Sequence, residues 1–279
     1  MKKEKRFKKA YVEIGNVCNL SCAFCPGTKR QPRLMNEAEF TLAADRLREY
    51  TDYLYFHLMG EPLLHPQLPE FIEIARQRDF RVIITTNGTL LGEKGAVLLR
   101  GGVHKVNISL QSFEANEGSS LESYVDSCAR FAAAASERGV LCVLRLWNEN
   151  GLDSLNDSIR AILSSHFPGA WRQSRRSLAL ATGVFLEPGE KFDWPDMAAQ
   201  EQPVSYCYGL RDQIAVLADG TVVPCCLDHD GDIPLGNIFC QELDEILDGA
   251  RARAIFEGFS RRHAVEELCR CCGYARRFG

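Results

Sequence analysis

The chain of 279 residues is long enough for one large α/β domain and a small appendage. Its formal net charge of −4 excludes a generally basic surface for nucleic acid, and the lysine-rich N-terminus lacks the apolar stretch of a secretory signal. Since no apolar run could span a bilayer either, we expect a cytoplasmic protein with neither a membrane nor intact nucleic acid as partner. Twelve cysteines in that reducing compartment indicate metal binding rather than disulfides.

Apolar, strand-like runs alternate with helical patterns from the N-terminus onward. Strands are expected at 11–15, 53–59, 81–87, 105–110 and 141–148, and helices at 36–50, 69–79, 91–100 and 121–138. A helix at 154–167 and a strand near 178–186 would add a sixth unit. Strict alternation predicts a parallel sheet covered on both faces, and six units predict a partial (β/α)6, TIM-like barrel. The expected fold class is therefore α/β.

The pattern changes after Pro188, where prolines and short elements replace the alternation. The pair Asp219-Gly220 lies between apolar runs at 213–217 and 221–224 and predicts a tight β-hairpin. Short helices are expected at 242–249 and 251–259. These changes predict two domains, a partial barrel at 1–190 and a small C-terminal extension at 191–279.

Three cysteines follow the first predicted strand. Cys18, Cys22 and Cys25 are separated by three and then by two residues. Each iron of a cubane iron–sulfur cluster takes one thiolate, so three cysteines leave the fourth iron open for chemistry. A structural zinc site needs four ligands, and the next candidate after Cys25 is the distant His57. The spacing therefore favours a 4Fe-4S cluster over zinc.

With Phe24 in front of the third cysteine, this motif resembles the signature of the radical S-adenosylmethionine (SAM) enzymes. The resemblance implies that the open iron chelates the amino and carboxylate groups of SAM. It also implies that an electron from the cluster cleaves SAM into methionine and a 5′-deoxyadenosyl radical, which abstracts a hydrogen atom from the substrate. The family's fold is a partial barrel of the kind predicted above.

Further segments at the ends of predicted strands match the family's SAM-binding motifs, and chemistry gathers at these strand ends in parallel barrels. The Gly-Glu-Pro motif implies that Glu61 accepts a hydrogen bond from the SAM amino group. The Thr-Asn-Gly motif implies that Thr86 and Asn87 line the SAM pocket. Ser109 keeps a hydroxyl for the SAM carboxylate or ribose, whereas Gln111 stands where the family commonly has an acidic residue.

Arg145 is an ionic residue in the otherwise apolar fifth strand. A buried arginine without a partner is costly, and the SAM carboxylate would be a suitable bidentate partner. A structural ion pair with Glu13 or Glu61 accounts for the same residue, and the sequence leaves both interpretations open.

A second set of cysteines lies in the C-terminal region. Cys207, Gly220 and Cys225 form the pattern Cys-x12-Gly-x4-Cys, and Cys269 and Cys272 follow. This arrangement resembles the twitch or SPASM extension of radical SAM enzymes, which implies an auxiliary 4Fe-4S cluster on these four cysteines. Zinc is the alternative, because a closed set of four cysteines suits it as well. Three further cysteines, Cys226, Cys240 and Cys271, are left over, and spacing alone leaves open that Cys271 replaces Cys269 or Cys272 as a ligand.

Asp228 and His229 are the candidate catalytic residues, because they stand beside the auxiliary cysteines and could bind a polar substrate or move a proton. Asp230 and Asp232, in the same segment, are expected in a solvated loop instead.

The motifs do not identify the substrate, for which a small molecule or nucleoside is expected. A cellular electron donor such as flavodoxin or ferredoxin is a further expected partner. The segments around Cys207 and Cys225 resemble the compact bacterial group that includes queuine lyase, which implies lysis of queuosine or its 5′-phosphate to release queuine. The alternatives are a radical SAM/SPASM peptide maturase and, in a different class, a non-catalytic iron–sulfur electron-transfer protein.

Overall fold

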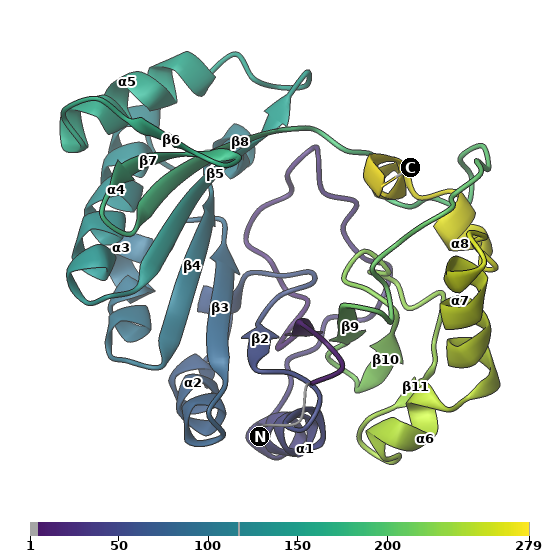
Figure 1. Cartoon of the computed structure of the whole chain (residues 1–279). Helices are drawn as coiled ribbons and strands as arrows, with labels where there is room; N and C mark the ends of the chain where they lie inside the picture. Colours follow the sequence, from purple (N-terminus) through teal and green to yellow (C-terminus); the bar gives the residue numbers. More distant parts are fainter. Residues whose placement is uncertain (1–4, 117, 279) are drawn as a thin grey trace.

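The computed structural model describes residues 5–116 and 118–278. Their strands form one sheet in the order β11-β10-β9-β1-β2-β3-β4-β5-β8-β7-β6. The neighbours from β9 to β8 all pair in parallel, and the sheet curls around the centre of the molecule as an open barrel (Figure 1). The predicted α/β fold with a parallel sheet is confirmed. The parallel strands are β1 (Lys9–Val12), β2 (Tyr53–Tyr55), β3 (Arg81–Thr86), β4 (Val103–Ser109), β5 (Leu141–Glu149), β8 (Val184–Glu190) and β9 (Gln213–Val216).

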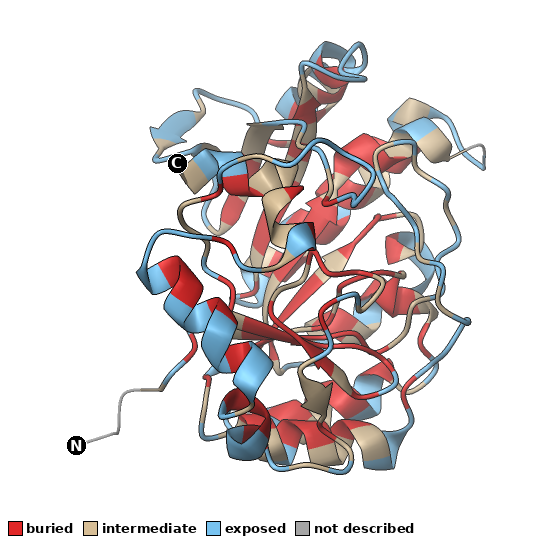
Figure 2. Ribbon diagram, turned by 90° about the vertical axis from the view of Figure 1, so that its right-hand side faces the viewer, coloured by how far each residue is buried: buried red, intermediate tan, exposed pale blue. Residues whose placement is uncertain are grey.

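Helices cover the outside of the curled sheet (Figure 1). The first of them begins at a capping box, in which the Asn36 side chain accepts from the Glu39 amide and the Glu39 carboxylate accepts from the Asn36 amide. Its apolar stripe, including Phe40 and Leu47, is buried against the strands, and Figure 2 shows this two-faced burial throughout the molecule. The covering helices are α1 (Glu37–Leu47), α2 (Leu68–Gln77), α3 (Leu91–Lys94), α4 (Leu121–Glu137) and α5 (Asn156–His166), with 3-10 turns η1 (Pro62–Leu64), η2 (Gly95–Leu99) and η3 (Leu110–Ala115).

The sixth predicted unit differs from the structure. Residues 178–186 do not form one strand, because the chain turns at Gly183, whose φ of +71° favours glycine. β7 (Ser177–Ala181) ends before this turn, and β8 pairs antiparallel with it and parallel with β5. β6 (Arg172–Ser174) completes that edge of the sheet. Because the residues on both sides of the turn are apolar, the sequence predicted one continuous strand where the structure has two.

The C-terminal hairpin is where the sequence predicted it, between β9 and β10 (Thr221–Val223). On its other side β9 pairs in parallel with β1, the first strand of the barrel, and this pairing was not predicted. Two segments some 200 residues apart in the sequence carry no local pattern that indicates their pairing. Because β9 pairs with β1, the C-terminal region continues the barrel sheet. Beyond it lie β11 (Gly236–Asn237), α6 (Leu243–Leu247), α7 (Ala250–Ser260), α8 (Glu267–Arg270) and η4 (Gly273–Phe278) (Figure 1).

All twelve cysteines lie in the described part of the chain, and all are free thiols. Within residues 5–116 and 118–278, none of the helices combines the length and apolar character that crossing a membrane requires.

Candidate active site

A cavity of about 520 Å³ lies at the ends of the first four strands, where the sequence predicted the SAM site. Its wall contains the three cysteines of the loop after β1 and the strand-end residues that were expected to bind SAM. We call it the SAM-site cavity. Its predicted members are Cys18, Cys22, Phe24, Cys25, Glu61, Thr86, Asn87 and Ser109.

Asn87 ties the cysteine loop to the end of β3. Its amide Nδ2 donates to Asn19 Oδ1 at 2.9 Å and to Cys18 Sγ at 3.8 Å. The Leu20 amide donates to the same sulfur at 3.5 Å. Hydrogen bonds of this kind favour the thiolate that an iron requires. Burial raises the pKa of Cys22 to about 11, so binding of iron there would displace a proton.

Glu61 is fixed before any ligand arrives. One carboxylate oxygen accepts from Thr86 Oγ1 at 2.8 Å and the Leu63 amide at 3.0 Å, and the other accepts from the Asn87 amide at 2.7 Å. Burial raises the pKa of Glu61, and these three hydrogen bonds oppose that shift. A carboxylate has more acceptor sites than three, so it can still receive an ammonium donor. Its role toward SAM stays a prediction.

The turn that presents Glu61 depends on Gly60. Its φ is +80°, and a Cβ there would lie 2.4 Å from the Gly15 carbonyl oxygen, within the loop that leads to the cysteines. We expect Gly60→Ala to destabilise the fold by about 2 kcal/mol beyond the cost of the backbone conformation alone. Urea unfolding measures this loss in the free energy of unfolding. Gly139→Ala is the matched control, since Gly139 has φ +74° with nothing within 4 Å of an added Cβ. Equal losses in the two variants would contradict a steric role for Gly60.

A second cavity, of about 300 Å³, lies between the SAM-site cavity and the C-terminal cysteines, and we call it the central cavity. It shares six wall residues with the SAM-site cavity and three with the cavity of the C-terminal cysteines. The first group is Phe24, His57, Leu58, Thr85, Ser109 and Trp194, and the second is Gln213, Leu227 and Tyr274. A molecule in the central cavity would therefore touch both sites.

Arg145 lines the central cavity and not the SAM-site cavity. Neither of the ion pairs considered for it forms, because Glu13 pairs with Arg30 at 2.6 Å and the Glu61 carboxylate is held by Thr86. The guanidinium instead lies 4.2 Å from the centre of the Trp147 ring. Arg145 stands beside Ser109 of the SAM-site cavity in the β4–β5 pair, and its contact with the SAM carboxylate stays a prediction.

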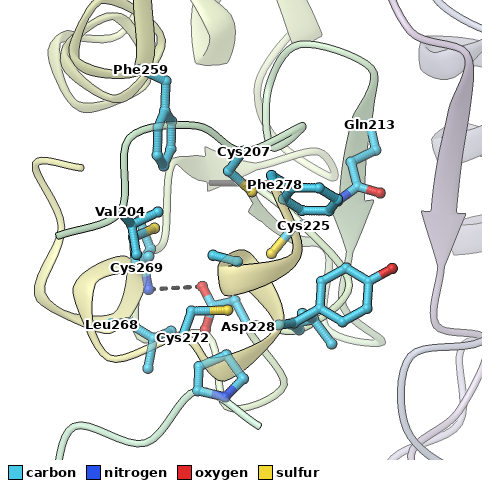
Figure 3. A pocket seen from close by; sticks show the side chains of 15 residues that line it. Val204, Cys207, Gln213, Cys225, Asp228, Phe259, Leu268, Cys269, Cys272 and Phe278 are labelled. Carbon is cyan, nitrogen blue, oxygen red and sulfur yellow. Dashed lines mark hydrogen bonds between the residues drawn. The ribbon is translucent and has the colours of Figure 1, made fainter. Parts of the chain in front are cut away.

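Four cysteines from distant parts of the chain line a third, small cavity of about 30 Å³, as the sequence predicted. Cys207 and Cys225 come from the β9–β10 region, and Cys269 and Cys272 come from the C-terminal end (Figure 3). Much of the remaining wall is apolar. We call it the auxiliary cavity. Cys226 points the other way and lines the central cavity beside Tyr11.

Asp228 and His229, the predicted catalytic candidates, do not line the central cavity. The Asp228 carboxylate lies on the wall of the auxiliary cavity and accepts from the amides of Asp232 and Ile233 at 2.8 and 2.9 Å (Figure 3). The His229 ring contacts the Leu227 carbonyl and the edge of Trp194. Both side chains therefore organise the loop 225–233.

This loop is attached to the cysteine loop by contacts that the sequence did not reveal. Asp230 accepts from Thr28 Oγ1 at 2.7 Å and the Lys29 amide at 2.9 Å, and Arg30 Nε donates to the His229 carbonyl at 2.8 Å. Trp194 Nε1 donates to the Phe24 carbonyl at 2.9 Å. Asp230 was expected in a solvated loop, but it joins the two regions.

The matching family models fall on these two regions. Residues 12–163, more than half of the chain, match the model described as the radical SAM superfamily. The chain belongs to the radical SAM superfamily. Residues 207–273 match the model described as SPASM, an iron–sulfur cluster-binding domain. The predicted family and C-terminal extension are confirmed.

Individual relatives of this radical SAM protein are distant. GTP 3′,8-cyclase of Chlorobaculum tepidum is 30% identical over 39% of this chain and 34% of its own length. The subtilosin biosynthesis protein AlbA of Bacillus subtilis is 22% identical over 95% of this chain and 65% of its own length. The chain thus spans about a third of the length of the first of these curated relatives and about two thirds of the length of the second. The crystal structure of BtrN with AdoMet and 2-DOIA superposes with a TM-score of 0.62 at 18% identity, covering 97% of this chain and 94% of BtrN.

The residues fit the cofactors of a radical SAM/SPASM protein. These are SAM, a 4Fe-4S cluster that binds it and an auxiliary iron–sulfur cluster, as predicted. Three thiols stand in the SAM-site cavity and four in the auxiliary cavity, where zinc had been the alternative. Across the described residues, no three His, Cys, Asp or Glu side chains converge enough to hold a single metal ion. A cubane does not require this, since each thiolate binds its own iron.

Proposed function

We propose that this radical SAM enzyme cleaves SAM reductively and abstracts a hydrogen atom from a small molecule held in the central cavity. The observation that carries the proposal is the position of that cavity, which shares walls with both the SAM-site cavity and the auxiliary cavity. When bound, the cluster and SAM supply the electron and the 5′-deoxyadenosyl radical. A protein of this kind would draw electrons from flavodoxin or ferredoxin in the cytoplasm.

The chain's own residues would position the reactants. The cysteine loop carries the cluster, with Asn87 fixing its geometry from β3. Glu61 would accept from the SAM amino group, and Thr86 and Ser109 would contact the rest of the cofactor. Phe24 and Trp194, which line both adjoining cavities, would keep water from the radical.

For the substrate we propose queuosine or its 5′-phosphate, with queuine as the released product. A cavity of about 300 Å³ is at the lower end of small-ligand sites and suits a compact molecule. Seven aromatic residues on its wall offer faces for stacking a planar base, namely Tyr11, Phe24, Tyr55, Trp147, Phe192, Trp194 and Tyr274.

Maturation of a peptide is the second candidate. Its support is the match to AlbA, which covers 95% of this chain, whereas the match to GTP 3′,8-cyclase covers only 39%. The structure of Streptococcus suis SuiB bound to the precursor peptide SuiA also superposes, with a TM-score of 0.61 at 14% identity over 98% of this chain and 73% of SuiB. At that identity the likeness concerns the fold alone.

The test is anaerobic turnover of the cluster-reconstituted protein with SAM and a strong reductant. We expect queuosine or queuosine 5′-phosphate to increase 5′-deoxyadenosine about tenfold or more over the rate without substrate, with free queuine appearing, as measured by mass spectrometry. Slow cleavage that neither compound stimulates would discard the queuosine proposal and favour the peptide candidate. Absence of cleavage by a cluster-replete protein would contradict the proposed activity.

A further inference from the structure

The central cavity collects buried polar atoms that have no partner. Within residues 5–116 and 118–278, five buried side-chain nitrogen or oxygen atoms lack a hydrogen bond. Three of them, His57 Nδ1, Gln111 Oε1 and Arg145 Nε, belong to residues that line this one cavity. Each unsatisfied buried group costs about 1–3 kcal/mol. Their concentration at one place points to a ligand that completes these hydrogen bonds.

The cavity is also positively charged. Arg145, Lys9 and Lys191 line it, and no aspartate or glutamate among the described residues does. The Arg145 side chain makes no hydrogen bond within this part of the chain, and no carboxylate of it lies within 4 Å of the guanidinium. The Trp147 indole donates at 2.9 Å to Glu187, a nearby carboxylate on β8. Glu187 also stands opposite Arg145 across the β5–β8 pair and partly offsets its charge, but the two side chains form no ion pair.

Two lysines of this region, Lys9 and Lys105, lie close to aromatic rings. Lys9 Nζ lies 5.1 Å from the ring centre of Tyr11 and 5.4 Å from that of Tyr55, and Lys105 Nζ lies 6.0 Å from the Tyr55 ring. Burial lowers the pKa of Lys9, and the nearby positive charge of Arg145 lowers it further. The aromatic faces attract these cations but do not neutralise them.

We propose that the central cavity binds an oxyanion of the substrate, a phosphate ester or a carboxylate, with Arg145 as the bidentate anchor and Lys9 as the second cation. The guanidinium suits this role because its planar fork matches both oxyanions, and its stacking on Trp147 fixes its plane. Burial and the nearby cations lower the pKa of His57 to about 3, so the imidazole is neutral and can bind an uncharged hydroxyl or amine. This inference rests on the proposed function and specifies its substrate class.

Equilibrium binding tests it without turnover. The cluster-reconstituted protein is saturated with SAM, so that further ligands enter the central cavity, and is then titrated with queuosine and with queuosine 5′-phosphate by calorimetry. We expect the phosphate to strengthen binding at least about tenfold. Arg145→Gln should reduce that difference to less than about twofold, and Arg145→Lys should keep part of it. Arg253→Gln, on the exposed face of α7, controls for the change in net charge.

Two small anions separate the remaining outcomes. Inorganic phosphate and acetate are each added at about 10 mM, and the rise that each causes in the melting temperature of the protein is compared. A rise in the wild type that Arg145→Gln lacks supports the anion site even if neither nucleoside binds, in which case only the queuosine proposal fails. A larger effect of acetate would assign a carboxylate. The inference is overturned if Arg145→Gln binds every probe as the wild type does, or if no probe binds either protein.

Discussion

Replacing Cys18, Cys22 and Cys25 together with alanine is expected to abolish formation of 5′-deoxyadenosine, while the auxiliary cluster remains. The two sets of cysteines line separate cavities, with the central cavity between them. Iron bound per chain should fall from about eight atoms to about four, because each cubane holds four irons. The rate of SAM cleavage should fall at least about 10³-fold, to the background without enzyme. Iron analysis and anaerobic turnover of the same sample measure both quantities.

Cys240→Ala is the matched control for this variant. Cys240 is an exposed thiol near β11, and its Sγ donates a hydrogen bond to the Asn237 carbonyl. We expect it to keep both the iron content and the activity. Activity that survives the triple substitution would assign the chemistry to another site. Iron bound without any cleavage in the wild type would instead favour the electron-transfer alternative.

The grouping of residues around the SAM-site cavity was predictable because they belong to short contiguous motifs at strand ends. The cysteine loop follows β1, Glu61 follows β2, and Asn87 follows β3, so a parallel sheet places them together. The auxiliary cysteines were predictable for a related reason, since Gly220 and its hairpin bring Cys225 back toward Cys207. In both cases the local pattern already contains the geometry.

The central cavity was not predictable in this way. Its wall combines one or two residues from each of the strands β1, β2, β3, β4, β5 and β9 with Tyr274 near the C-terminus, and together they form no contiguous motif. Lys9 and Tyr11 face it because alternate residues of a strand share one side, but the sequence does not indicate which side is enclosed. Arg145 shows the same limit. An arginine in an apolar strand predicted an anionic partner, but only the fold indicates which cavity would hold that anion.

Glu13→Gln is expected to have the largest effect on stability of the substitutions considered. The Glu13 carboxylate is fully buried and accepts from Arg30 Nη1 and Nη2 at 2.8 and 2.6 Å. It also accepts from the Ala218 amide at 3.0 Å, which joins the cysteine loop to the β9–β10 turn. An amide at this position would leave the largely buried Arg30 without its counter-charge. Removing one partner of such a pair costs about 3–5 kcal/mol, which urea unfolding would record.

Two further variants isolate the cause of that loss. Glu137→Gln, at the exposed end of α4, makes the same chemical change and should alter the free energy of unfolding by less than about 0.5 kcal/mol. The double variant Glu13→Gln/Arg30→Met removes the unpaired charge and should be more stable than Glu13→Gln alone, even though it loses the bond from Arg30 to the His229 carbonyl. If the double variant is the less stable of the two, hydrogen bonding rather than charge holds the cysteine loop against the loop 225–233. In either case, a raised KM for SAM in Glu13→Gln would connect this network to the geometry of the cysteine loop.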